Sequence, residues 1–164
     1  MEEFVKEIFY AYPLLKTVDK DYQDHIKNQA VLSYRSGLAT ERLAEYLVEE
    51  IIQRQRFVWL KSKVEEVLNK LDELERTMVA VRYFGKKRSG ACLATVAMSK
   101  WGERKYFREQ ERLGNKLGVM LTGAGVSEGL FVEWFASTEL FCAVRKRASL
   151  KAESISGRER RWLE

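Results

Sequence analysis

Residues 103–121, ERKYFREQERLGNKLGVML, have the spacing of an amphipathic helix. At 3.6 residues per turn, their apolar side chains and one glutamine fall along a single line of the helix surface. We therefore expect this line to pack against a hydrophobic core and to set the orientation of the helix. The line consists of Tyr106, Gln110, Leu113, Leu117 and Met120.

The opposite side of this helix is basic. It carries three arginines at intervals of four residues, with two lysines at its flanks. Arginine can donate two hydrogen bonds to a phosphate or to O6 and N7 of guanine, whereas lysine suits phosphate. A solvated face with internal charge pairs is the alternative. The residues of this helix that we expect to contact DNA are Arg104, Lys105, Arg108, Arg112, Asn115 and Lys116.

Positive charge is concentrated around the same helix. Residues 78–121 contain ten Lys or Arg and only three acids, while the whole chain has a net charge of +5. A local basic block of this kind is typical of a nucleic-acid-binding element. The block includes a predicted basic loop, in which Lys86, Lys87 and Arg88 are further candidates for DNA contact.

The remainder of the chain also predicts helices, and the fold class that we expect is all-α. No segment alternates with period two, and the only proline is Pro13. Asp72 and Glu75 have the spacing of a capping box, and Ser127 can cap a later helix, bent near residues 137–138. Besides 103–121 and the helix after Ser127, we expect helices at 2–11, 14–34, 41–70, 72–84 and 91–98.

Two of these helices carry apolar patterns whose partners the sequence leaves open. The segment 41–70, one long helix or a pair of helices in line, has an apolar series with steps of mostly three, four or seven residues, which predicts one buried face. The last helix has an aromatic patch at Phe131, Trp134, Phe135 and Phe141, for which core packing is expected and a partner groove is the alternative. The series in the long helix is Leu43, Leu47, Ile51, Phe57 or Val58, Val64, Leu68 and Leu71.

Two segments resemble region 4 of the sigma-70 family, its C-terminal helix-turn-helix domain. LDELERTMVAVRYFG at 71–85 is similar to the family's Leu–acid–ERxxxxLRYF helix, and 103–121 is similar to its recognition helix with an RL…KL end. A short helix and a turn between them fit this motif. The matching residues are Leu71, Leu74, Glu75, Arg76, Val79, Val81, Arg82, Tyr83, Phe84, Arg112, Leu113, Lys116 and Leu117.

The resemblance implies a sequence-specific DNA-binding transcriptional regulator, like the small sigma-like proteins of Gram-positive bacteria and their phages. Its partner would be double-stranded DNA, and RNA polymerase is a further candidate. The family's acid-led middle helix is replaced here by Leu93–Ala97, and its N-cap serine by Trp101-Gly102. Residues 1–70 contain no counterpart of the region that reads the −10 promoter element, so we do not predict a complete sigma factor. The alternative is a helical protein-protein interaction module without DNA binding.

Within this scheme, the chain divides into four segments. They are an N-terminal helical region at 1–70, a helix-turn-helix region at 71–121, a C-terminal helix or helices at 122–151, and a flexible tail at 152–164. The target DNA sequence, the direction of regulation and the oligomeric state are left open.

Other classes of function find little support. His25 is the only histidine, so no Ser-His-Asp or Cys-His arrangement is available, and a zinc site needs several ligands. We therefore predict neither an enzyme nor a cofactor or metal. The sequence contains no uncharged apolar run of about 18 residues, so we predict no membrane span. Cys92 and Cys142 do not belong to a CxxC pair, which favours a cytoplasmic protein.

Overall fold

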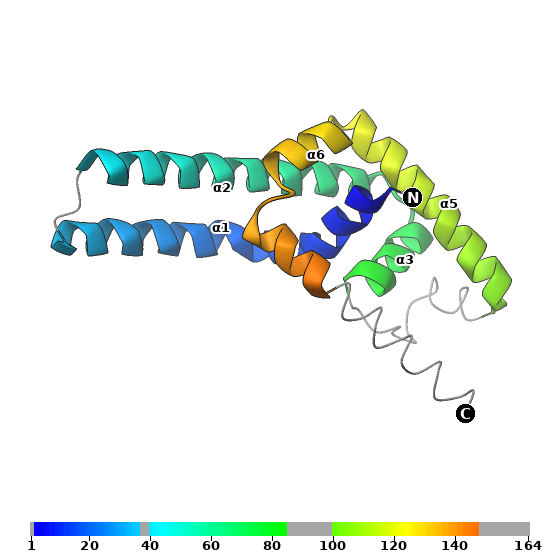
Figure 1. Cartoon of the computed structure of the whole chain (residues 1–164). Coiled ribbons are helices and arrows are strands. Elements are labelled where there is room, and N and C mark those ends of the chain that lie inside the picture. The colour runs from blue at the N-terminus through cyan, green and yellow to red at the C-terminus, as the bar shows by residue number, and fades with distance from the viewer. Residues whose placement is uncertain (1, 37–39, 85–99, 148–164) are drawn as a thin grey trace, which may run out of the picture.

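The computed structural model describes residues 2–36, 40–84 and 100–147, and every regular element within them is a helix (Figure 1). The predicted all-α fold is confirmed. None of the described helices is long and apolar enough to cross a membrane. The helices are α1 Glu3–Ser36, α2 Thr40–Asn69, α3 Glu73–Tyr83, α5 Glu103–Gly123 and α6 Glu128–Trp134, followed by helical residues 139–147.

Several predicted features lie outside the described residues. They are the short helix at 91–98, the candidate DNA contacts Lys86, Lys87 and Arg88, and the tail at 152–164. Of the predicted helix-turn-helix region, the structure therefore describes α3 and α5 alone.

The prediction that Pro13 separates two helices was wrong. α1 runs through Pro13 without interruption, although proline cannot donate the helical hydrogen bond and its ring crowds the preceding turn. Phe9, Tyr12 and Leu15 are buried on both sides of Pro13, so tertiary packing holds the helix together there. In Figure 1 the dark-blue start of α1 runs at an angle to the remainder, as expected for a proline kink.

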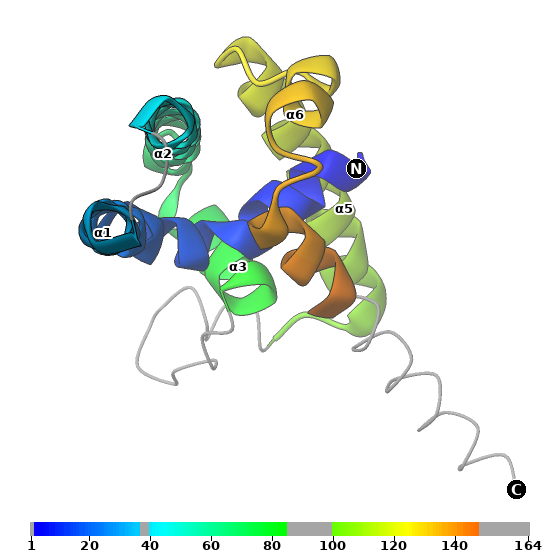
Figure 2. The ribbon, with the colours of Figure 1, turned by 60° about the vertical axis from the view of Figure 1, so that its left-hand side comes forward.

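The helices are arranged as a bundle with a projecting arm. α1 and α2 run side by side in opposite directions, and their far halves extend beyond the other helices (Figures 1 and 2). α3, α5 and α6 gather around the first part of α1, and α5 also contacts α2. α5 lies at the end of the molecule opposite the arm, which leaves one of its sides facing outward (Figure 1).

One hydrophobic cluster joins all of these helices. Aromatic rings connect α1 to α6 through Phe4 and Phe131, whose centroids are 5.9 Å apart, and α1 to α3 through Phe9 and Tyr83, at 5.7 Å. Phe135 is also fully buried. Core packing is thus confirmed for three of the four residues in the aromatic patch, while Trp134 is partly exposed.

Local signals set the ends of the shorter helices. The capping box at the start of α3 is confirmed: Asp72 accepts from the Glu75 backbone N–H, and the Glu75 side chain accepts from the Asp72 N–H. Ser127 caps α6 by accepting from Leu130 N–H. Gly125 follows α5 with φ of 94°, a left-handed conformation that glycine adopts at little cost. The chain turns here, and α6 can fold back over α2.

The last long helix predicted after Ser127 is divided in two. α6 ends at Trp134, residues 135–138 form turns, and helical residues resume at 139. The side-chain hydroxyl of Thr138 donates to Phe135 O at 2.7 Å within this break. The predicted bend near residues 137–138 therefore coincides with the break in the structure.

Glu7 on α1 is a partly buried acid, with 14% of its side chain exposed. Its Oε2 has no hydrogen-bond partner among the described residues, and Arg145 Nη1 lies 3.8 Å away. Burial raises the pKa of the Glu7 carboxyl above its ordinary value; the nearby Arg145 lowers it and Glu3 raises it. A raised carboxyl pKa means that the folded protein holds its proton more tightly than the unfolded chain does.

We predict that Glu7→Gln raises the free energy of unfolding at neutral pH. The folded state binds more protons than the unfolded chain above the ordinary pKa of 4.5, so ionised Glu7 destabilises the fold as pH rises. Glutamine removes that charge. Urea denaturation at a series of pH values should show a higher free energy of unfolding for the variant than for the wild type at pH 7. This difference should disappear well below pH 4.5. A variant less stable than the wild type at pH 7 would contradict this account.

Candidate nucleic-acid interface

α5 places its residues as the sequence pattern requires on its buried side. Leu113 and Leu117 are buried as predicted, together with Leu121 one turn further on. Gln110 is also buried, while Tyr106 and Met120 at the ends of the line are partly exposed. This side of α5 faces the cluster formed with α1 and α2.

Gln110 is a polar residue in a buried position, and its hydrogen bonds explain why it is tolerated. Its Oε1 accepts from Arg82 Nη1 at 3.0 Å, and its Nε2 donates to Tyr106 OH at 3.2 Å. Both ends of the amide are satisfied, so burial does not leave an unpaired polar group. Because Arg82 belongs to α3, the amide also helps to fix the rotation of α5 relative to α3.

The opposite side of α5 presents the predicted arginines to solvent. Arg104, Arg108, Arg112 and Asn115 are all exposed. The side chains of Arg108 and Arg112 are 74% and 83% exposed. Their guanidinium nitrogens lie 3.9 and 4.0 Å from the carboxylate oxygens of Glu109, which are long distances for an ion pair. Exposed ion pairs at such distances contribute about 0–1 kcal/mol. They would not prevent the guanidinium groups from binding another anion.

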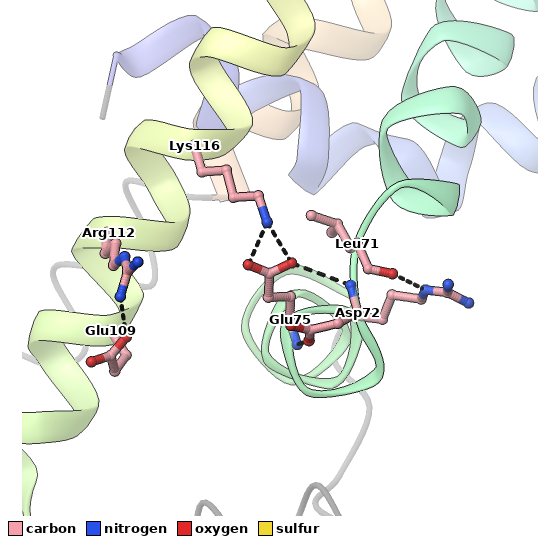
Figure 3. Close-up of polar contacts among 7 residues, drawn as sticks. Leu71, Asp72, Glu75, Glu109, Arg112 and Lys116 are labelled. Carbon is pink, nitrogen blue, oxygen red and sulfur yellow. Dashed lines mark hydrogen bonds and ion pairs between the residues drawn. The ribbon is translucent and has the colours of Figure 1, made fainter.

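The two flanking lysines differ from this pattern. Lys105 is exposed, with its Nζ 5.0 Å from the centroid of the Trp101 ring at the start of α5. Lys116 points toward α3, where its Nζ is 2.6 and 2.8 Å from the two carboxylate oxygens of Glu75 (Figure 3). Its ammonium forms a close salt bridge between the helices, so Lys116 joins α3 to α5 and is directed toward α3.

Glu75 has two structural roles, of which the sequence predicted one. The capping box was recognisable from its spacing, but Glu75 also binds Lys116, 41 positions away. Figure 3 shows the Glu75 carboxylate between Lys116 and the backbone of Asp72. One side chain thus closes the start of α3 and attaches α3 to α5.

Phe107 is an exposed residue of α5 that the charge pattern of the sequence does not single out. It is exposed on α5, three positions after Arg104, with its ring 5.9 Å from that of Tyr106. Its position off the buried line was a signal available in the sequence. A solvated helix has no need of a large aromatic side chain at this place, whereas a helix in a DNA groove can use one against a thymine methyl group.

No group of three or more His, Cys, Asp or Glu side chains that could hold a metal is found among the described residues. Nε2 of His25 lies 2.8 Å from Tyr46 OH, a contact that joins α1 to α2 in the arm. The basic side of α5 is therefore the candidate functional site.

Comparisons of the chain with protein-family models, with curated proteins and with solved structures found no match. The resemblance to region 4 of the sigma-70 family stays a prediction from the sequence. The function is accordingly inferred from the geometry and charge of α5.

Leu117→Ala should lower the free energy of unfolding by about 2–5 kcal/mol, because it removes a fully buried side chain and leaves a cavity. Val119→Ala, two positions away on the exposed side of α5, is the matched control and should change it by less than about 0.5 kcal/mol. Urea denaturation of both variants tests the orientation of the helix. Equal losses of unfolding free energy in the two variants would contradict the observed orientation of α5.

The salt bridge between Glu75 and Lys116 should contribute about 0.2–1 kcal/mol of coupling energy, since Lys116 is partly exposed. A double-mutant cycle with Glu75→Gln and Lys116→Met measures it. Glutamine keeps an acceptor for the Asp72 N–H, so the capping box is preserved. A coupling energy of zero would show that the two side chains do not interact in solution.

Proposed function

We propose that this protein binds double-stranded DNA through the exposed side of α5 and acts as a transcriptional regulator. One observation carries the proposal: three arginines recur along the outward side of a helix whose other side is buried. They are Arg104, Arg108 and Arg112. A helix held in this way can present several cations to one groove at once.

The dimensions of α5 suit the major groove. The helix has 21 residues and is therefore about 31 Å long, and the groove is about 12 Å wide, enough for one helix. Steps of four residues place neighbouring arginines about 6 Å apart along the axis. The outward side of α5 lies at the edge of the part of the molecule that is described (Figure 1). DNA could approach it without displacing a described helix.

The exposed residues divide into base-reading and backbone-binding candidates. Arg108 is opposite the buried line and in the middle of the arginine series, so it is the best candidate for guanine. Asn115 suits adenine, and Phe107 suits a thymine methyl group. Lys105 lies at the flank of this side, where contact with phosphates is expected.

The acids of α5 limit how much of the affinity can be non-specific. The helix holds five Lys or Arg and three Glu, so its own net charge is small. Glu111 lies on the exposed side between Arg108 and Arg112, where it would repel a phosphate but could accept from cytosine N4. This composition favours a helix that selects a sequence over one that binds any duplex tightly.

DNA affinity should fall with salt. With Lys116 directed toward Glu75 and Arg108 assigned to a base, three cations remain as candidate phosphate contacts: Arg104, Lys105 and Arg112. For about three contacts, log K should fall against log[salt] with a slope near −2.7. Fluorescence anisotropy with duplexes selected from a random pool measures the slope.

Arg108→Ala should weaken binding to the selected DNA sequence by about 1–3 kcal/mol and broaden the range of sequences that the protein binds.

Lys27→Ala is the control for this experiment, because Lys27 is an exposed cation of α1 and does not belong to α5. It should leave both the slope and the preference unchanged. Absence of duplex binding at low salt would overturn the proposal and favour the protein-interaction alternative. Binding that Arg108→Ala leaves unchanged would place the interface elsewhere.

A further inference from the structure

A pocket lies where α3 packs beside the first part of α1 and the end of α2 (Figure 1). Its volume is about 350 Å³, within the range of about 300–1,000 Å³ that is usual for small-molecule sites. The residues that line it belong to these three helices and to the C-cap of α3: Tyr12, Pro13, Lys16, Leu68, Arg76, Ala80 and Phe84. None of these lining residues belongs to α5, so the pocket is separate from the proposed DNA-binding side of that helix.

The walls of this pocket are largely apolar. Pro13, Leu68, Ala80 and Phe84 are each only partly buried, so part of their apolar surface is available to a ligand. The Phe84 ring packs against the Tyr12 ring with their centroids 5.1 Å apart and their planes tilted by 39°. An aromatic ring that enters the pocket can pack on the accessible side of Phe84 and bury apolar surface of its own.

Two cations from different helices line the same pocket. Lys16 of α1 has its Nζ 4.9 Å from the centroid of the Tyr12 ring. Arg76 of α3 donates from Nε to Leu71 O at 2.8 Å, a hydrogen bond that orients the guanidinium and uses one of its five N–H groups. Neither cation forms an ion pair with a carboxylate that the structure describes.

No acid is among the described residues that line the pocket. Glu65 is nearby, but its Oε1 accepts from Tyr12 OH at 3.4 Å and lies 4.0 Å from Lys61 Nζ. Burial and the adjacent Glu65 raise the pKa of the Tyr12 hydroxyl above its ordinary value, so this hydroxyl carries no negative charge at neutral pH. The charge that lines the pocket is therefore positive, and an anion is complementary to it.

We propose that this pocket binds a small organic anion that carries an aromatic ring, with aromatic carboxylates as the chemical class. The ring lies against Phe84, and the carboxylate accepts hydrogen bonds from Arg76 and Lys16. The planar guanidinium suits a carboxylate because it can donate two parallel hydrogen bonds to it. A neutral ring leaves both cations without an anion, and a small anion without a ring leaves the apolar walls exposed to water.

This site does not depend on DNA binding by α5. Arg76 and Ala80 lie on a different side of α3 from Glu75 and Arg82, since each residue turns the helix surface by about 100°. Glu75 and Arg82 are the residues of α3 that bond to α5. Occupation of the pocket therefore leaves these contacts in place, and the two sites can be tested separately.

Isothermal titration calorimetry of the full chain tests the ligand class. The probes are benzoate and 2-naphthoate, compared with 2-naphthalenemethanol, acetate and inorganic phosphate. At least one of the two aromatic carboxylates should bind at a single site with a dissociation constant below about 1 mM. The neutral ring and the two anions without a ring should bind at least about tenfold more weakly. Absence of saturable binding by both carboxylates would overturn the proposal, as would equally tight binding of phosphate.

Charge removal tests the residues. Arg76→Gln and Lys16→Gln should each raise the dissociation constant of the better carboxylate at least about tenfold, because each removes a charge-assisted hydrogen bond. Lys27→Gln, at an exposed lysine further along α1, is the matched control and should leave it unchanged. Circular dichroism confirms that each variant is folded. Unchanged affinity in both pocket variants, or an equal loss in the control, would overturn the assignment.

Nuclear magnetic resonance locates the bound probe. On addition of the better carboxylate, the backbone amide shifts that change most should be those near Leu68, Ala80 and Phe84. The amide of Val119, an exposed residue of α5, is the reference and should not shift. Changes centred on residues 104–112 would show that the anion binds to the basic side of α5, and would overturn the proposal.

Discussion

Burial of the first turns of α1 is the constraint on which the other helices depend. Val5, Ile8, Phe9 and Ala11 are fully buried, and this part of the helix contacts α2, α3 and α5. Each large apolar side chain buried here contributes about 1.5–3 kcal/mol, more than any exposed ion pair of the structure. A helix near the N-terminus therefore organises the basic region in the second half of the chain, and the two cannot be treated as independent units.

The orientation of α5 follows from this packing. Leu113, Leu117 and Leu121 bind the helix to the core, while Gln110 and the salt bridge from Lys116 connect it to α3. Apolar burial supplies most of the energy, and the polar contacts set the rotation of the helix. Because the buried line is fixed, the arginine series has one position available to it, facing outward. The candidate interface is thus a consequence of the core.

The sequence correctly predicted the features that depend on the residues of a single helix. Period and spacing within a segment predicted the buried line of α5, the capping box at Asp72 and the cap at Ser127, because these depend on neighbours a few residues away. Pro13 was misjudged because packing on both sides of it outweighs the cost of a proline within a helix. The pairing of Lys116 with Glu75 could not be foreseen, since it depends on how two helices cross.

The apolar residues of α2 also show that the pattern within one helix does not reveal which of its sides is buried. The sequence placed Ile51 and one of Phe57 or Val58 in a single apolar series, whereas the structure buries Phe57 and leaves Ile51 and Val58 exposed. The predicted series therefore combined residues from two sides of α2, and only one of these sides packs against α1 and α6. A helix with two apolar sides is stable in water when both are covered, and packing within the described chain covers one.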